Sequence, residues 1–148
     1  LFSFEGWRKR LFLLNETVLA LLLSRGVLTE FIRFFYFHPR PFDTLGIQAL
    51  IGESGSSFPS GHAAFFFALA TVLFFYRRKW GIWYFAFAVI NGVARIFVGV
   101  HWPLDIVGGA AVGIASAAFI HGTLGASFRL LFRDSEALPS EPKNLESQ

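Results

Sequence analysis

The stretch SGHAAFFFALATVLFFY, from Ser60 to Tyr76, contains no Asp, Glu, Lys or Arg. Three further apolar stretches run from Leu11 to Phe37, from Trp80 to Val100 and from Pro103 to His121. Each is close to the ~20 residues that an α-helix needs to cross the ~30 Å hydrocarbon core of a bilayer. The sequence therefore predicts an all-α fold, an integral-membrane helical bundle in which four transmembrane helices are visible.

The composition favours a membrane location. Of the 148 residues, 54% are hydrophobic and 16% are charged, and the mean hydropathy is +0.53. A soluble domain of this size needs more polar residues than this to cover its surface. The formal net charge is +3 and the pI is near 9.7. Because the basic residues are not gathered on one polar face, we expect no nucleic-acid partner.

The first apolar stretch is the least regular of the four. Its sequence is interrupted by Asn15, Glu16, Arg25 and Glu30, and Gly26 lies near its middle. We expect this helix to bend, or to turn its polar side against neighbouring helices.

The chain is predicted to be one transmembrane domain followed by a polar tail. Residues 1–133 hold the four apolar stretches, and turn-forming residues between Phe42 and Pro59 predict a loop. Residues 134–148 are polar, which predicts a disordered tail. The chain starts at Leu1 and contains no methionine, so we expect it to be an N-terminally truncated piece.

Basic residues near the ends of the apolar stretches predict the topology. The segments Arg8–Arg10 and Arg77–Lys79, with Arg129 and Arg133, fall on one side, which the positive-inside rule makes cytoplasmic together with the tail. The other side holds basic residues that this rule does not explain: Arg33, Arg40, Arg95, His38, His62 and His101.

Three segments on that outer side are suited to binding a phosphate. Arg33 and Arg40 can both direct guanidinium groups at one anion. Ser60 and Gly61 lie where a loop enters a helix, and backbone N–H groups at a helix N-terminus bind anions. Gly61 lets a phosphate approach the main chain closely.

The third segment supplies a histidine with a carboxylate partner. Asp105 follows His101 by four residues and can hold the imidazole tautomer. Pro103, between them, suits the first turn of a helix. Taken singly, an outer arginine is usually a lipid-headgroup anchor, and a lone histidine is usually a satisfied polar group. Three arginines, two histidines and one carboxylate on one face instead predict an anion site with a nucleophile and an acid.

These segments resemble the type 2 phosphatidic acid phosphatase superfamily, whose signature is K-x6-R-P, then P-S-G-H, then S-R-x5-H-x3-D. The resemblance covers Arg33 to Asp105. Two positions depart from the signature, because Arg33 replaces a lysine and Ala94 replaces a serine whose hydroxyl binds the phosphate in the family. Loss of one such donor can cost ~2.7–4 kcal/mol of transition-state stabilisation, so we expect reduced activity but still an enzyme.

The resemblance implies a mechanism that uses no metal and no cofactor. His101, oriented by Asp105, would attack phosphorus and become a phosphohistidine, and His62 would protonate the leaving oxygen and later activate water. The remaining carboxylates Asp43 and Glu53 are too few for a two-metal site. The phosphoryl oxygens would be held by Arg33, Arg40, Ser60, Gly61 and Arg95. His38 is assigned to the rim of the site.

The expected substrate is a lipid phosphate whose tail stays in the bilayer. The sequence His-Pro-Arg-Pro-Phe, from His38 to Phe42, resembles bacterial undecaprenyl-diphosphate phosphatases, which places the active site on the extracytoplasmic side of a bacterial plasma membrane. Phosphatidic acid and phosphatidylglycerol phosphate remain alternatives, as does a catalytically silent lipid-phosphate binder. A transporter is disfavoured because the charges cluster at one face. The sequence carries no indication of oligomeric state, and superfamily members usually have six transmembrane helices.

Overall fold

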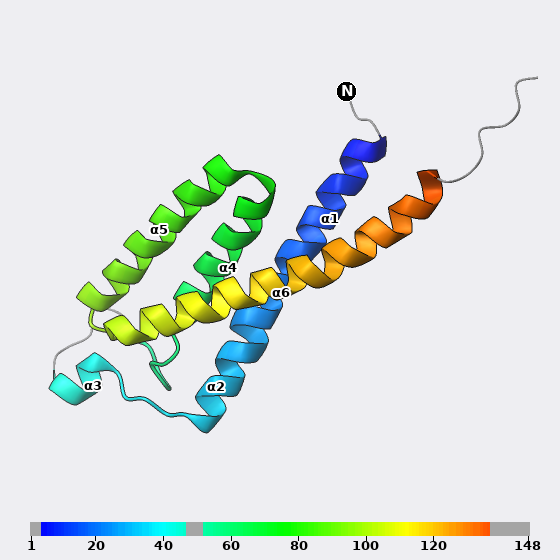
Figure 1. Cartoon of the computed structure of the whole chain (residues 1–148). Coiled ribbons are helices and arrows are strands. Elements are labelled where there is room, and N and C mark those ends of the chain that lie inside the picture. Colours follow the sequence, from blue (N-terminus) through cyan, green and yellow to red (C-terminus); the bar gives the residue numbers. More distant parts are fainter. Residues whose placement is uncertain (1–3, 47–51, 137–148) are drawn as a thin grey trace, which may run out of the picture.

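The computed structural model describes residues 4–46 and 52–136, which form helices and connecting loops without a strand. In chain order the helices are α1 (Phe4–Leu21), η1 (Leu22–Leu28), α2 (Thr29–Phe35), α3 (Pro41–Leu45), α4 (Gly61–Tyr76), α5 (Arg78–Phe97) and α6 (Pro103–Glu136) (Figure 1). The predicted all-α bundle is confirmed within these ranges. The expected loop after Phe42 contains the short helix α3, and its residues 47–51 lie outside the described ranges.

The first membrane helix is continuous but not regular. Leu21 and Leu28, at the joints between α1, η1 and α2, both keep right-handed helical backbone angles. The segment η1 between them is a wider π-helix, in which hydrogen bonds join residues five apart. Thr29 follows that spacing, since its Oγ1 donates to the carbonyl oxygen of Ser24 at 2.8 Å. The irregularity expected around Gly26 is therefore a π-helical segment.

Small residues let α6 pack closely on α4. The position that a Cβ on Gly113 would take is 2.8 Å from the backbone nitrogen of Ala68. At Gly109 the same position is 2.8 Å from the Cβ of Ala63. Backbones approach this closely in membrane bundles when small residues line the interface. As a result, α4 is enclosed by its neighbours, with Ala63, Ala64, Ala68, Ala70 and Val72 buried.

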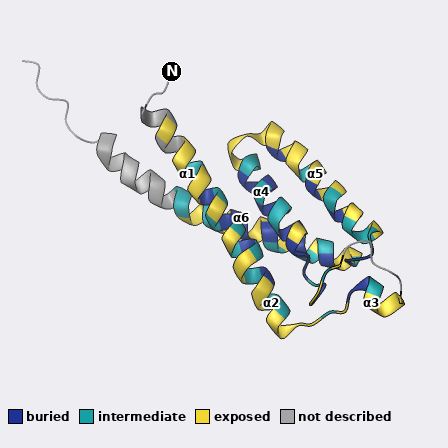
Figure 2. Ribbon diagram, turned by 180° about the vertical axis from the view of Figure 1, so that it is seen from behind, coloured by how far each residue is buried: buried dark blue, intermediate teal, exposed yellow. Residues whose placement is uncertain are grey.

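The outside of the bundle is apolar. Among the described residues, three spans are long and apolar enough to cross a membrane, namely Arg10–Phe35, Arg78–Phe97 and Pro103–Gly125. Gly61–Tyr76 is apolar but shorter, at 16 residues. Much of the ribbon of these helices is coloured as exposed in Figure 2, and the exposed large apolar residues include Phe34 at 83% and Phe97 at 85% exposure. Because such a surface is stable in lipid and not in water, the chain is an integral membrane protein.

The two ends of the bundle differ in what they carry. The start of α1, the α4–α5 connection and the end of α6 lie toward one end, and α3, the start of α4 and the α5–α6 connection lie toward the other (Figure 1). The basic segments that predict the topology therefore belong to the first end. Helix α6 continues to Glu136, so the first residues of the predicted tail are helical, and residues 137–148 lie outside the described ranges.

Candidate active site

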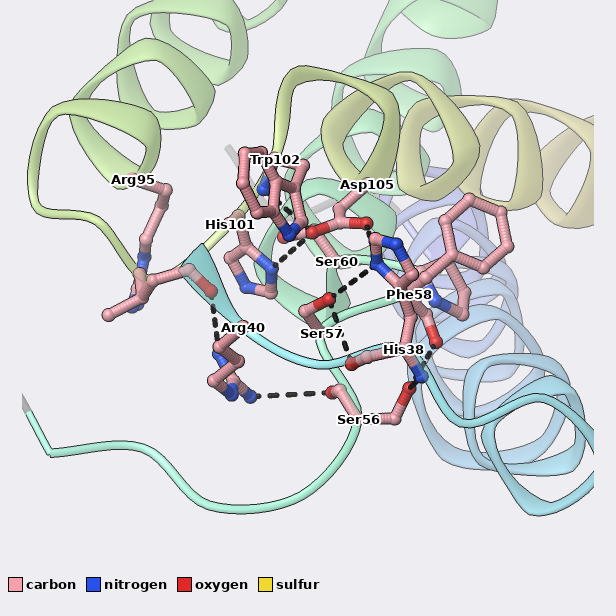
Figure 3. Close-up of polar contacts among 12 residues, drawn as sticks. His38, Arg40, Ser56, Ser57, Phe58, Ser60, Arg95, His101, Trp102 and Asp105 are labelled. Atoms are coloured by element: carbon pink, nitrogen blue, oxygen red, sulfur yellow. Dashed lines mark hydrogen bonds and ion pairs between the residues drawn. The ribbon is translucent and has the colours of Figure 1, made fainter. Parts of the chain in front are cut away.

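Backbone hydrogen bonds tie the three predicted segments together at one end of the bundle (Figure 3). The N–H of Ser57 donates to the carbonyl oxygen of His38 at 2.8 Å, and the N–H of Ser60 donates to that of Asp105 at 2.9 Å. The N–H of Phe42 donates to the carbonyl oxygen of Gly99 at 3.2 Å. The side chains on these segments are thus held on a common backbone framework.

Ser60 forms the N-terminal cap of α4. Its side-chain oxygen accepts a hydrogen bond from the backbone N–H of Ala63 at 3.4 Å, and the residue is fully buried. The cap fixes the place where the loop becomes helix and so positions His62 in the first turn. The room left by the missing side chain of Gly61 is taken by Arg25, whose Nε lies 2.5 Å from the position of a Cβ. The sequence predicted a phosphate close to the main chain at this position.

His101 and Asp105 are both buried, with 1% and 0% exposure. Nδ1 of His101 lies 3.5 Å from Oδ2 of Asp105, which is an ion-pair distance and longer than most N–H···O hydrogen bonds. The same Oδ2 accepts the backbone N–H of Trp102 at 2.7 Å. This bond fixes the carboxylate at the start of α6, so Nδ1 of the imidazole faces Asp105 and Nε2 faces the other way.

Glu53, which sequence analysis treated as a spare carboxylate, lies opposite Nε2 of His101. Its Oε2 is 3.9 Å from that nitrogen and 2.7 Å from Nη1 of Arg40, and its Oε1 pairs with Nη1 of Arg95. Partial burial opposes ionisation, but Arg40 and Arg95 outweigh it and hold the pKa of the Glu53 carboxyl below its ordinary value. A carboxylate is therefore held by two arginines beside the imidazole. No motif or spacing in the sequence indicates this contact.

Arg40 is 2% exposed and has several acceptors besides Glu53. Its Nη1 donates to the carbonyl oxygen of Val100 at 3.0 Å, and Nε donates to that of Gly55 at 3.2 Å. Nη2 donates to the carbonyl oxygen of Ser56 at 3.4 Å. The guanidinium thus joins the loop before α4 to the segment before α6 (Figure 3).

Two further arginines contact the turn that leads into α4. Arg33 donates from Nε and Nη2 to the carbonyl oxygen of Pro59, at 3.3 and 3.0 Å. Nη2 of Arg95 contacts Nε2 of His62, while its Nη1 pairs with Glu53. His62 is thereby linked through Arg95 and Glu53 to His101, so the structure brings together both predicted histidines.

His38 is more than a rim residue. Its side chain is 31% exposed, but Nδ1 lies 2.9 Å from Oγ of Ser57 and 3.5 Å from Oδ1 of Asp105. The indole Nε1 of Trp102 donates to the carbonyl oxygen of Pro39 at 3.1 Å, which holds this segment against the start of α6. Asp105 therefore has a histidine on each of its two oxygens (Figure 3). Sequence spacing gave no sign of this contact because it crosses between separate segments.

Within the described ranges, no group of three or more His, Cys, Asp or Glu side chains is arranged to hold a metal ion. The two acidic side chains closest to the histidines are already engaged, Asp105 by Trp102 and Glu53 by two arginines. The groups that gather at this end of the bundle are thus histidines, engaged carboxylates and the arginines that pair with them.

Comparison with known proteins agrees with this description. Residues 16–129 match the PAP2 superfamily. The bacitracin transport permease protein BcrC of Bacillus licheniformis is 40% identical over 57% of this chain and 42% of its own length. The undecaprenyl-diphosphatase BcrC of Bacillus subtilis is 36% identical over 60% of this chain and 46% of its own length.

A solved structure shares the arrangement of helices. The crystal structure of Aquifex aeolicus LpxE superposes with a TM-score of 0.64 and 34% identity, over 71% of this chain and 64% of that chain. The fold and the matching residues together place this chain in one class of integral membrane proteins. This chain belongs to the PAP2 superfamily. It spans less than half the length of the two curated relatives above.

Proposed function

We propose that this chain carries the active site of a membrane lipid phosphatase that hydrolyses a lipid diphosphate, undecaprenyl diphosphate being the best candidate. The observation that supports this most strongly is the carboxylate of Glu53, held by Arg40 and Arg95 with an oxygen 3.9 Å from Nε2 of His101. A phosphoryl group bound by the same two arginines would face the same nitrogen. The guanidinium group of arginine forms paired hydrogen bonds with phosphate as it does with carboxylate.

In the proposed first step, Nε2 of His101 attacks phosphorus and forms the P–N bond. The bond from phosphorus to the leaving oxygen breaks, and that oxygen takes the electron pair. His62 supplies a proton where the leaving group needs one. Asp105, on the Nδ1 side of the imidazole, stabilises the positive charge that His101 gains.

In the second step, water attacks phosphorus as His62 accepts its proton, and the P–N bond breaks to release inorganic phosphate and restore His101. The phosphoryl oxygens are held during both steps by Arg33, Arg40, Arg95 and the start of α4 at Ser60 and Gly61. Positioning and charge stabilisation account for most of the acceleration in phosphoryl transfer. No metal is required in this scheme, because charge neutralisation comes from the arginines.

The substrate proposal has two supports. The named activity of the Bacillus subtilis relative is that of an undecaprenyl-diphosphatase. The apolar exterior of the bundle also allows a lipid tail to stay in the bilayer while its phosphate reaches the site. By the positive-inside rule, the basic segments at the opposite end support an extracytoplasmic site with the tail in the cytoplasm.

Phosphate release from a panel of lipid phosphates tests this function. Detergent-solubilised protein is expected to release phosphate fastest from undecaprenyl diphosphate, and more slowly from phosphatidic acid and phosphatidylglycerol phosphate. His101→Ala is the negative control and should release no phosphate above background. Equal release from the wild type and His101→Ala would refute the proposed function, and binding without release would identify a silent lipid-phosphate binder.

A further inference from the structure

Arg25 is a charged residue of the first membrane helix that the proposed mechanism does not use. It precedes Arg33 by eight residues, about 12 Å along a helix axis, so it lies deeper in the membrane-spanning helix than Arg33. Its Nε and Cζ lie 2.5 and 2.9 Å from where a Cβ on Gly61 would be. A charge at this depth is costly and is usually functional. Arg25 therefore reaches the active site from the side of the lipid tail.

The π-helical segment directs Arg25 toward the site. Side chains on an α-helix lean toward its N-terminus, which here points away from the active site. Arg25 instead pairs through Nη1 with Glu30, which lies five residues later in the first turn of α2, directly after η1. The hydroxyl of Thr29 and the carbonyl of Ser24 show the same five-residue spacing. The π-helical geometry thus places Arg25 and Glu30 on one face, at the end that carries the site.

Glu30 is shared by two arginines. Its Oε1 pairs with Arg25 and lies 3.5 Å from Nη1 of Arg33. Both Glu30 and Arg25 are accessible, with side-chain exposures of 51% and 43%. The arrangement repeats that of Glu53 between Arg40 and Arg95. Each carboxylate thus lies between two arginines, and Arg25, Arg33 and Arg95 contact the turn from Pro59 to His62.

We propose that Arg25 forms a second anion subsite, next to Arg33, that binds the phosphoryl group of a lipid diphosphate that is not transferred. This inference rests on the proposed function. In a lipid diphosphate this group lies between the transferred phosphoryl group and the tail, which is the direction in which Arg25 lies. When the terminal P–O bond breaks, the bridging oxygen keeps the electron pair and becomes part of the lipid monophosphate. Arg25 stabilises that charge, and Glu30 leaves the pair as the substrate binds.

A matched pair of substrates tests the subsite. Farnesyl diphosphate and farnesyl monophosphate differ only by one phosphoryl group, so the full chain in detergent is assayed with both. Arg25→Gln is expected to lower kcat/KM for the diphosphate by about 10- to 100-fold, the usual loss for one charged hydrogen bond, and to change the monophosphate by less than about threefold. Arg78→Gln, at the opposite end of the bundle over the Phe74 ring, is the control. Equal losses on both substrates, or no loss, would overturn the proposal.

A second measurement does not depend on turnover. Calorimetry with methylenediphosphonate, which is not hydrolysed, should show weaker binding to Arg25→Gln and tighter binding to Glu30→Gln, because the second variant removes the competing carboxylate. Inorganic phosphate should bind the wild type and Arg25→Gln alike. Since misfolding cannot tighten binding, unchanged or weaker binding in Glu30→Gln would count against the subsite. Absence of phosphate release from both farnesyl compounds by the wild type would instead refute the proposed function.

Discussion

Nδ1 of His121 on α6 lies 2.8 Å from Oε1 of the fully buried Glu16 on α1. The other carboxylate oxygen of Glu16 accepts a hydrogen bond from the hydroxyl of Tyr76, the last residue of α4. The ring of Phe75 stacks on His121 at a centroid distance of 4.1 Å. One buried carboxylate therefore joins three helices at the end of the bundle opposite the active site.

Breaking this contact should destabilise the bundle. His121→Leu leaves the buried Glu16 carboxylate with one partner fewer, a loss of about 1–3 kcal/mol. Thermal unfolding in detergent should therefore show a lower Tm. The control Leu104→Ala changes an exposed side chain of the same helix and should alter the Tm little. An unchanged Tm in His121→Leu would mean that the contact contributes nothing to stability.

The close packing of α6 on α4 predicts a difference between two glycines of α6. Gly113→Ala places a Cβ against the backbone of α4, 2.8 Å from the nitrogen of Ala68, and should lower the Tm. Gly122→Ala meets nothing within 4 Å and should leave the Tm unchanged or raise it, since alanine favours helix by about 1 kcal/mol. Equal effects of the two variants on thermal unfolding would contradict the packing described here.

Glu53 predicts a pH dependence of stability. Its pKa is lower when folded than when unfolded, where a glutamate titrates near ~4.3. Its contribution is therefore present above that value and is lost as the pH falls through the folded pKa. Glu53→Gln should flatten the fall of the Tm in acid. Asp43→Asn, which changes an exposed carboxylate of α3, is the control and should keep the slope of the wild type.

Trapping of a phosphoenzyme distinguishes the roles of His62 and His101. With p-nitrophenyl phosphate, whose leaving group needs no proton, His62→Ala should form phosphohistidine and hydrolyse it slowly, so the intermediate should accumulate. His101→Ala should form none. Asp105→Asn should lie between, because it disturbs the imidazole without removing it. Acid-labile label that persists in His101→Ala would show that the nucleophile is another residue.

Much of the fold could be predicted, because the length and the composition of an apolar stretch are enough to indicate a membrane helix. The start of α6 at Pro103 also followed from local chemistry, since proline suits the first turn of a helix. The start of α4 at Gly61 agrees with the prediction that a loop enters a helix there. The contact between His101 and Asp105 could be predicted, because Asp105 follows His101 by four residues at the start of a helix. These features depend on neighbours in the sequence.

The missed contacts depend on the path of the chain between segments. Glu53 reaches Arg95 across a sequence separation of 42 residues, and no periodicity marks it in its loop. The backbone N–H of Ser57 donates to the carbonyl oxygen of His38, and this bond holds His38 in the segment where its side chain lies near Asp105. The direction of Arg25 depends on a π-helical segment, which hydrophobic spacing does not reveal. Such contacts are fixed by tertiary structure.

The π-helical segment also sets the angular phase between the two ends of the first helix. Glu16 must face His121 at one end while Arg33 faces Pro59 at the other. Removing a single residue from η1, for example Gly26, would turn one end relative to the other by about 100°. Both contacts could then not be kept. The number of residues between Glu16 and Arg33 therefore fixes how the two ends of the helix are rotated relative to each other. Residues in this interval can be substituted, but none can be inserted or deleted without loss of one of the two contacts.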